Sequence, residues 1–347
     1  MTNNNLIFIA KLNDASEIMQ FIDDEWKKGH IFATNKDFFL YEYQNKNNLN
    51  FVISKSKSNK INGILGFLKS SSEENSTVWT TMWKVSKSSG SPMLGVDMLN
   101  FLRTQGFKSV MSLGINEQTK DIYKYLHFHV GVMNHYFIPN LRVKEKKISI
   151  MPKDIGEYKH SYIKSQELSF KRVGLIDLED NFDFNKCTFQ LPFKDLNYFQ
   201  RRYFQHPIYD YDLYGSYRNN KLEAVIVVRI FKYLDSTCMR IVDFYGQENF
   251  LEFITSNLIE LMYEASHEYI DFYCEGLSKK MILKAGFLEV DFKNKELVIP
   301  NHFEPFVQKN IAISYFTDSQ CIENLRIFKA DGDQDRPSSP NKDVFSK

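Results

Sequence analysis

The segment Val110–Phe128, VMSLGINEQTKDIYKYLHF, constrains the fold of this chain more than any other segment. Its first residues are an apolar run that predicts a short buried strand. Asn116 stands where this strand ends, a position at which its side chain can cap a following helix. Apolar residues then recur at helical spacing, Tyr123 projects from the same turns, and Phe128 closes the helix. The segment therefore predicts a strand–helix–strand unit of an α/β (α+β) protein.

Length and composition fit two packed domains. The chain has 347 residues, of which 43% are hydrophobic and 15% aromatic, enough for packed cores over most of its length. The formal net charge is +1, and Lys and Arg are spread along the chain without a basic block. We therefore expect no nucleic-acid partner on electrostatic grounds.

The sequence shows no signal for export, for the membrane or for a metal. The N-terminus lacks a basic region followed by a long apolar core, and the longest apolar run is AVIVV at Ala224–Val228. The four cysteines (Cys187, Cys238, Cys274 and Cys321) form no CxxC pair, and histidines and carboxylates lack metal-ligand spacing. We expect a cytoplasmic protein with reduced thiols and no metal.

Residues 1–140 predict one α/β unit. Strands are expected at 6–9, 50–54, 61–68 and 78–85, the last being the alternating, aromatic-rich VWTTMWKV. Helical segments are expected at 13–26, 30–43 and 94–104.

Residues 141–330 repeat this order in weaker form. We expect a hairpin of strands 211–217 and 222–231, a strand at 238–245, a helix from 251 and a strand at 269–274. KKMILKAGFLEV in this half echoes KDIYKYLHFHVG in the first. The pattern predicts duplication of one unit, and the alternative is a single domain with a separate α/β appendage. Residues 331–347 are expected to form a polar loop or tail.

The pattern of Val110–Phe128 resembles the C-terminal half of the GNAT acyltransferase fold, whose members carry N-x-x-[AT]-x-x-[IL]-Y-x-x-x-[GH]-F. The resemblance implies two GNAT-like domains in tandem, each a mixed, mainly antiparallel twisted sheet flanked by helices. It also implies an enzyme that moves an acyl group from coenzyme A to an amine.

The stretch KSSGSPMLG, Lys87–Gly95, stands where this family binds the pyrophosphate of coenzyme A. Small residues let a phosphate approach the backbone, a helix N-terminus favours anions, and Pro92 can begin the helix. The stretch departs from the family pattern [QR]-x-x-G-x-[GA], because Met93 and Gly90 stand at its first glycine and basic positions; a plain linker is the alternative. The second half has only GQENF, which is short and acidic, so we expect acyl-CoA in the N-terminal domain alone.

The resemblance implies a set of residues that contact acyl-CoA. Lys84 and Lys87 could add positive charge near its phosphates. The set is Trp83, Lys84, Val85, Lys87, Ser89, Gly90, Ser91, Met93, Leu94, Gly95 and Asn116.

Acyl transfer needs oxyanion donors, an acid for the leaving thiolate and a base for the amine. The resemblance implies a backbone N–H near Trp83–Val85 as oxyanion donor and Tyr123 as the acid. The fourth strand carries no carboxylate, which puts a conventional base in doubt. His30 is therefore the predicted base, because its ordinary pKa of about 6.5 suits proton removal near neutrality. His206 is a competitor.

Two segments are candidates for the acceptor site. Asp195–Gly215 is rich in tyrosine and basic residues, and Arg forks suit phosphates while aromatic rings stack on bases or sugars; an amphipathic helix at a domain interface is the alternative. The C-terminal FKADGDQDRPSSPN fails the calcium-loop pattern and either binds sugar hydroxyls or an ammonium group or is a disordered tail. The candidate residues are Arg201, Arg202, Tyr203, His206, Asp331, Asp333, Asp335 and Arg336.

The whole layout resembles tandem-GNAT enzymes of bacterial polysaccharide biosynthesis, such as O-antigen or capsule synthesis. This resemblance implies transfer of an acetyl or hydroxybutyryl group from acyl-CoA to the amino group of a dTDP- or UDP-linked aminodeoxysugar, by direct attack in a ternary complex. Two alternatives remain at this point: a tandem-GNAT aminoacyl transferase that uses charged tRNA, and a non-catalytic binding protein.

Overall fold

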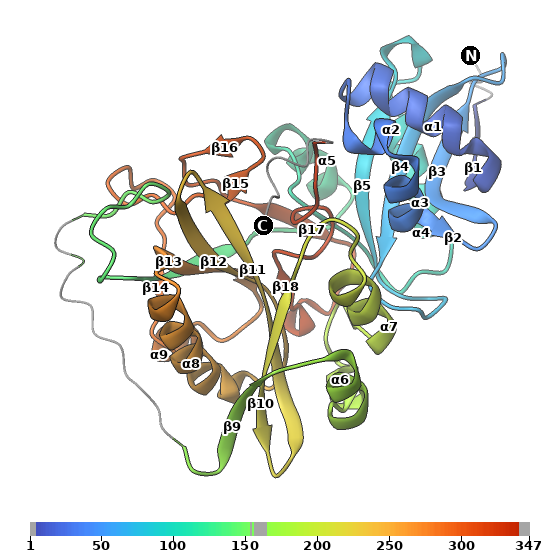
Figure 1. Cartoon of the computed structure of the whole chain (residues 1–347). Helices are drawn as coiled ribbons and strands as arrows, with labels where there is room; N and C mark the ends of the chain where they lie inside the picture. Colours follow the sequence, from blue (N-terminus) through green and yellow to red (C-terminus); the bar gives the residue numbers. More distant parts are fainter. Residues whose placement is uncertain (1–4, 153–154, 156–164, 340–347) are drawn as a thin grey trace. The chain divides into compact units, whose positions relative to one another are not determined.

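The computed structural model of the chain describes residues 5–152, 155 and 165–339, which form two compact units (Figure 1). Unit 1 consists of residues 5–130, 315–320 and 332–339, and unit 2 consists of the remaining described residues. Each unit contains a mixed sheet flanked by helices. The predicted fold class of two α/β units in tandem is therefore confirmed.

The sheet of unit 1 has the order β1-β3-β4-β5-β6-β17-β7, with β2 paired to β3. The strands from β1 to β5 pair in antiparallel fashion, whereas β5 and β6 are parallel. Its strands are β1 (Leu6–Lys11), β2 (Gln44–Asn45), β3 (Asn48–Lys55), β4 (Ile61–Lys69), β5 (Val78–Val85), β6 (Val110–Leu113), β7 (His129–Val132) and β17 (Ser314–Thr317).

Helices cover both faces of this sheet, because neighbouring residues of a strand point to opposite faces. Val52 of β3 packs in one cluster with the apolar side of α4. Its neighbour Phe51 contacts α3 instead, with ring centroids 5.7 Å from Phe39 and 4.5 Å from Tyr43. The helices of unit 1 are α1 (Ala15–Phe21), α2 (Ile31–Thr34), α3 (Lys36–Tyr43), α4 (Leu94–Arg103) and α5 (Lys120–Tyr125).

The sheet of unit 2 has the order β14-β8-β13-β12-β11-β10-β9, and β18 pairs with β13. Here β12 and β13 are the parallel neighbours. Its strands are β8 (Asn134–Pro139), β9 (Leu168–Arg172), β10 (Asp212–Arg218), β11 (Lys221–Tyr233), β12 (Ser236–Gly246), β13 (Tyr269–Glu275), β14 (Leu288–Glu289) and β18 (Ile327–Phe328); β15 (His302–Phe303) and β16 (Phe306–Val307) form a separate hairpin.

The long helix of unit 2 packs its apolar side on the sheet, and Figure 1 shows it in orange beside α9. None of the helices in the described ranges combines the length and apolar character that a membrane span requires. The helices of unit 2 are α6 (Leu175–Asn181), α7 (Leu196–Phe199), α8 (Leu251–Glu264) and α9 (Lys279–Lys284).

Two strands cross between the halves of the sequence. The strand β8 lies at the end of the first half but pairs over six residues with β13 of the second half. The strand β17 lies near the chain's end but pairs with β6 of the first half. The structure therefore differs from the predicted limits 1–140 and 141–330, because hydrogen bonding draws residues 131–140 into unit 2. It also places residues 332–339 in unit 1 instead of a separate tail, while residues 340–347 lie outside the described residues.

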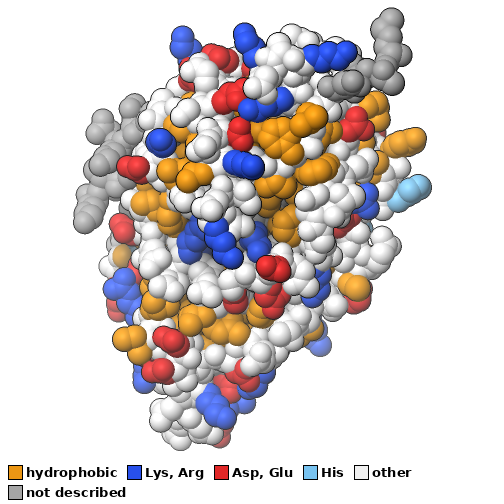
Figure 2. Space-filling model, turned by 90° about the vertical axis from the view of Figure 1, so that its right-hand side faces the viewer, with side chains coloured by type: hydrophobic (Ala, Val, Ile, Leu, Met, Phe, Trp, Pro, Cys, Tyr) orange, Lys and Arg blue, Asp and Glu red, His pale blue; other side chains and the backbone are white. Residues whose placement is uncertain are grey.

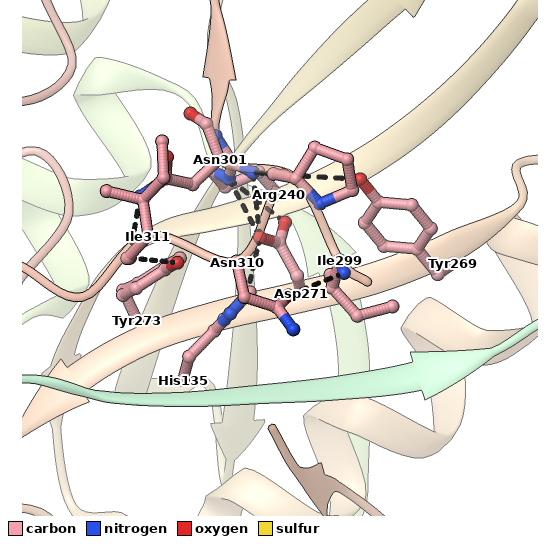
Figure 3. A network of polar contacts seen from close by, with 10 residues as sticks. His135, Arg240, Tyr269, Asp271, Tyr273, Ile299, Asn301, Asn310 and Ile311 are labelled. Atoms are coloured by element: carbon pink, nitrogen blue, oxygen red, sulfur yellow. Dashed lines mark hydrogen bonds and ion pairs between the residues drawn. The ribbon is translucent and has the colours of Figure 1, made fainter. Parts of the chain in front are cut away.

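A buried polar network joins β8 to β13 and β12 (Figure 3). His135 Nε2 lies 3.0 Å from Asp271 Oδ2, and Arg240 Nη2 lies 2.8 Å from the same oxygen. The guanidinium also donates to the backbone carbonyls of Pro300 and Asn301. Burial lowers the pKa of His135 to about 4, so the neutral ring donates from Nε2 to the Asp271 carboxylate. The Arg240–Asp271 ion pair thus links β12 to β13, and the His135–Asp271 hydrogen bond links β13 to β8.

Candidate functional site

The parallel strands of unit 1 separate after a short paired stretch. Val78–Thr80 of β5 pairs with Val110–Ser112 of β6, but β5 continues to Val85. Within the described residues, the second half of β5 therefore has no strand partner on its β6 side. Backbone N–H and C=O groups at such a split need another partner, which a ligand can provide.

A β-bulge lies at the point where β5 leaves β6. The pairing of β4 with β5 shifts register between Ile64 and Gly66, and Met82 on the opposite strand has a φ of 43°. A non-glycine residue with this φ is strained, and such strain concentrates at functional sites. Because a bulge re-aims the residues that follow it, the backbone of Trp83–Val85 is presented differently from a regular strand.

The helix that follows β5 begins without a side-chain cap. Met93 is the N-cap residue of α4 and its side chain makes no capping hydrogen bond. Leu94 N donates to the Ser91 carbonyl at 3.3 Å, whereas the amides of Gly95 and Val96 have no acceptor among the described residues and are available to an anion. Gly90 in the preceding loop has a φ of 65°, which glycine adopts readily. Neither Lys84 nor Lys87 forms an ion pair with another described residue, whereas Asp97 places one carboxylate in the first turn of α4.

Trp83 brings a hydrogen-bond donor to this helix start. A Cβ atom on Gly95 would lie 3.2 Å from the Trp83 indole, so only glycine leaves ordinary room for the ring there. Trp83 Nε1 is buried and has no hydrogen-bond partner among the described residues. A buried N–H without an acceptor costs free energy, and an anionic or carbonyl ligand would remove that cost. The helix start and this N–H are the groups of this region that could bond an anion.

Tyr123, on α5, lies beside Trp83 of β5. Its ring stacks on Phe316 of β17 at 4.1 Å between centroids and lies 6.0 Å from the ring of Trp83. Burial raises the pKa of Tyr123 to about 12, so the phenol keeps its proton near neutrality. The Asn116 side chain accepts a hydrogen bond of 3.1 Å from the Gln118 amide, which confirms the predicted cap.

The α3 side of β5 carries a different set of groups. The Tyr43 hydroxyl lies 3.0 Å from Thr81 Oγ1, one residue before the strained Met82. Arg336 Nε donates to Glu42 Oε2 at 2.7 Å, in a pair whose side chains are both nearly inaccessible. The negative charges of Glu42 and Asp333 both raise the pKa of the Tyr43 hydroxyl, after the larger effect of burial.

The segment 332–339 runs along this side of unit 1. The Gln334 amide donates to the Leu113 carbonyl at the end of β6, and the Ser338 carbonyl accepts from Ile31 N at 3.4 Å. Two of the predicted acceptor residues, Asp335 and Arg336, are therefore held in folded structure. In the ranges that the structure describes, no three His, Cys, Asp or Glu side chains are arranged to hold a metal ion.

The structure places His30 as a helix cap. Its Nδ1 accepts a hydrogen bond of 3.2 Å from the Phe32 amide at the start of α2. In a neutral ring, Nε2 then carries the hydrogen and has no lone pair for an amine proton. Burial, followed by the charge of Lys27, lowers the pKa of His30 to about 4. The role of base stays a prediction for His30, and this geometry counts against it.

In unit 2, the corresponding split is filled by the chain itself. Met239–Ile241 of β12 pairs with Ile270–Phe272 of β13, again over three residues. The strand β18 then pairs with Cys274 and Glu275 at the end of β13. The next residues also reach β12, since Ala330 N donates to the Val242 carbonyl at 2.8 Å. Residues 327–331 thus cover, in unit 2, the position that corresponds to the end of β5, which has no strand partner on its β6 side among the described residues.

A buried lysine anchors this filling segment. Lys194 Nζ lies 2.8 Å from both carboxylate oxygens of Asp243 and 3.0 Å from Asp331 Oδ1. Asp331 Oδ2 also accepts from Phe328 N at 2.8 Å. Burial alone lowers the pKa of Lys194, but the two carboxylates outweigh it and the pKa is raised. Burial raises the pKa of Asp331 to about 6 against the attraction of Lys194.

The predicted acceptor residues are divided between the units. Tyr203 donates to Asp243, so Tyr203 and Asp331 meet around Lys194 in unit 2. Arg202 is buried and donates to the Tyr211 hydroxyl at 2.6 Å, while Arg201 is exposed. His206 Nδ1 accepts from the amides of residues 208 and 209, which folds its segment back on itself. Asp333, Asp335 and Arg336 lie in unit 1.

Sequence reasoning missed the residues that organise both regions. Lys194 and Asp243 form a buried ion pair in unit 2. On the α3 side of unit 1, Glu42 pairs with Arg336 and Tyr43 bonds to Thr81. One signal was present: Asp243 interrupts the apolar strand MRIVDFYG, and a carboxylate buried in a strand requires a cation. Lys194 carries no comparable signal, because it stands in a mixed segment of polar and apolar residues.

No protein-family model matches the sequence, and no curated protein is similar to it. Solved structures do share the fold. A GCN5-related N-acetyltransferase from Anabaena variabilis ATCC 29413 matches 90% of this chain and 72% of its own, at 10% identity and a TM-score of 0.57. A probable N-acyltransferase from Enterococcus faecalis V583 matches 92% of this chain and 73% of its own, at 8% identity and a TM-score of 0.55. The chain therefore has the fold of GCN5-related N-acetyltransferases over most of its length.

Proposed function

We propose that this chain is an acyl-CoA-dependent N-acyltransferase whose coenzyme A site lies in unit 1. The observation that carries the proposal is the contrast between the two sheets. In unit 1 the split between β5 and β6 ends at a strained bulge, beside an uncapped helix and an unpartnered indole N–H. In unit 2 the chain's own residues 327–331 fill the same place.

The residues of unit 1 can perform the steps of direct acyl transfer. The amides at the start of α4, with Trp83 Nε1 beside them, hold the diphosphate. A backbone N–H that follows Met82 stabilises the oxyanion as the amine attacks the thioester carbonyl. The carbon–sulfur bond then breaks, the Tyr123 hydroxyl donates its proton to the departing thiolate, and the attacking nitrogen loses one proton to solvent, from which the tyrosinate regains its own.

The acceptor amine is best accommodated on the α3 side of β5. Two carboxylates, Glu42 and Asp333, act there on the Tyr43 hydroxyl, which is bonded to Thr81 next to the bulge. Glu42 is paired with Arg336, so Asp333 adds the further negative charge that would attract an ammonium acceptor. The ammonium releases its proton to solvent, and the neutral amine then attacks. The finer proposal, an aminodeoxysugar linked to dTDP or UDP, rests on the resemblance of the whole sequence layout to polysaccharide-modifying enzymes.

Surface charge gives less support to the alternative that uses charged tRNA. On the face shown in Figure 2, several Lys and Arg side chains gather near the middle, and the others lie among Asp, Glu and uncharged side chains. The formal net charge of the whole chain is only +1. Proteins that hold nucleic acid rely on concentrated positive charge to neutralise phosphates.

Thiol release tests the proposed function directly. Acetyl-CoA and 3-hydroxybutyryl-CoA are each offered with dTDP- and UDP-linked aminosugars, the matching free aminosugars and charged tRNA, and free thiol is followed with a chromogenic disulfide. We expect release with an aminosugar nucleotide and a product heavier by one acyl group in the mass spectrum. Release only with free aminosugars would remove the nucleotide from the proposal. Release of thiol only with charged tRNA would overturn the proposal. The absence of thiol release with every acceptor in the panel would overturn it as well.

A further inference from the structure

Unit 2 contains a cavity of about 790 Å³ that the acyl-transfer proposal does not use. Its walls come from the end of α6 and the segment that follows it, from the turn between β10 and β11, and from the end of β12 with the next two residues, Gln247 and Glu248. None of its lining residues belongs to unit 1. The volume falls within the range of small-molecule sites, roughly 300–1,000 Å³.

The lining of this cavity is rich in primary amides. A primary amide has two N–H donors and one acceptor oxygen, a pattern that matches hydroxyl groups, since these also donate and accept. Asn181 Nδ2 already donates to the Asp177 carbonyl and Gln247 Nε2 to Glu223 Oε2, which leaves each of them one N–H and its oxygen. Five such side chains line one cavity: Asn181, Gln190, Asn219, Asn220 and Gln247.

An exposed aromatic ring completes the lining. The side chain of Phe189 is 53% exposed, although a phenylalanine is normally covered. Phe182 and Leu222, both buried, line the floor. The C–H face of a sugar ring packs on such apolar and aromatic surface, while its hydroxyl groups face the amides.

The charges of the cavity disfavour a phosphate. Its lining contains four carboxylates (Asp180, Asp183, Glu223 and Glu248) and three cations (Lys186, Lys221 and Arg326). One of the cations is already engaged, because Arg326 Nη2 lies 3.0 Å from Glu248 Oε1. Glu248 also precedes α8, where a phosphate site would instead need free positive potential. A ligand without phosphate therefore fits better.

We propose that this cavity is a binding site for an unphosphorylated carbohydrate, either a single sugar ring or a short oligosaccharide. The amides and carboxylates bond its hydroxyl groups, and Phe189 packs against its apolar face. This inference goes beyond the proposed acyl transfer and does not depend on it.

The test uses the full chain without acyl-CoA. Saturation-transfer NMR and titration measure binding of methyl glycosides of glucose, galactose, glucosamine and N-acetylglucosamine, of maltotriose and chitotriose, and of glucose 1-phosphate. We expect binding of at least one unphosphorylated sugar. Phe189→Ala should weaken it by roughly tenfold or more through loss of the ring contact, and Gln247→Ala should weaken it less. Ile176→Ala is the matched control, because Ile176 is 73% exposed and does not line the cavity.

Three results would overturn the inference. The first is that no sugar in the panel binds. The second is that a sugar binds equally well to wild type, Phe189→Ala and Gln247→Ala, which would locate it elsewhere. The third is that glucose 1-phosphate binds more tightly than methyl glucoside. Because the assay contains no acyl donor, each result is independent of thiol release in the acyl-transfer assay.

Discussion

Tyr123 is the residue whose hydroxyl we assign to the departing thiolate. Replacement by phenylalanine keeps the ring that stacks on Phe316 and removes only this donor. A thiol with an ordinary pKa of about 8.5 leaves readily, so the acid contributes modestly. We expect Tyr123→Phe to lower kcat by roughly tenfold with little change in the KM for acyl-CoA, measured by thiol release.

The same helix provides a control for this substitution. Tyr125 lies on α5 with its side chain 81% exposed, so Tyr125→Phe should leave kcat unchanged. Equal kcat values for wild type and Tyr123→Phe would show that the hydroxyl takes no part in the reaction. Thermal unfolding of both variants separates a loss of catalysis from a loss of stability.

Substitutions of His30 distinguish a structural role of this histidine from a catalytic role. Asparagine is a good N-cap residue, so His30→Asn should keep both the cap of α2 and most of the activity. His30→Ala should lower the free energy of unfolding by about 0.5–2 kcal/mol through loss of the cap. If His30→Asn instead lost roughly a hundredfold or more in kcat without losing stability, the predicted role of base would be restored.

Asp331 makes the stability of the protein depend on pH in one window. Its pKa is raised from 3.8 to about 6, so between about pH 4 and pH 6 the folded chain keeps a proton that the unfolded chain has lost. The contribution of this group to the free energy of unfolding therefore falls as the pH rises through this window.

Asparagine at this position removes that titration. Urea unfolding of wild type and Asp331→Asn from pH 4 to pH 7 gives the difference in unfolding free energy. We expect this difference to change between about pH 4 and pH 6 and to be flat above that range. A flat difference over the whole range would contradict the raised pKa.

At the scale of elements, β18 and the ion pairs of Lys194 that hold the segment after it fill the position beside β12 and β13 in unit 2. Lys194→Met would leave Asp243 buried without its cation, and removing one partner of a buried pair costs about 3–5 kcal/mol. We expect the free energy of unfolding in urea to fall by about that amount. Lys280→Met, at an exposed position of α9, is the control and should change it little. Equal stability of the two variants would show that Lys194 does not anchor the segment.

The elements of each half could be predicted because their signals are local. The alternation of VWTTMWKV predicted strand 78–85, and the structure has β5 at Val78–Val85. The apolar spacing predicted helix 94–104, and α4 spans Leu94–Arg103. The hairpin around Asn219 and Asn220 is formed by β10 and β11. Periodicity and turn chemistry within about ten residues were sufficient in each case.

The exchanged strands could not be predicted in this way. Tyr315 of β17 pairs with Leu113 of β6, about two hundred residues earlier, and nothing in either short segment specifies the other. The triad of Lys194, Asp243 and Asp331 likewise joins three distant segments. The acyl-CoA site at residues 83–95 was inferred from one continuous segment and stays a prediction, whereas the predicted acceptor residues are divided between the two units.

At the scale of the whole molecule, the strand exchange makes the proposed site of unit 1 depend on both ends of the chain. Phe316, from the strand near the C-terminus, supports the ring of Tyr123. The segment 332–339 supplies Arg336 to Glu42 and Asp333 to the surroundings of Tyr43. The second half of the sequence thus contributes to a site in unit 1 even though the split of its own sheet is filled.

The location and number of bound coenzyme A molecules test the central claim most directly. We expect a crystal structure with acetyl-CoA to show one molecule per chain, with its diphosphate at the amides of Gly95 and Val96 at the start of α4 and its thioester beside Tyr123. Calorimetric titration should give the same stoichiometry. A coenzyme bound between β12 and β13 after displacement of residues 327–331, or no bound coenzyme at saturating concentration, would contradict the account.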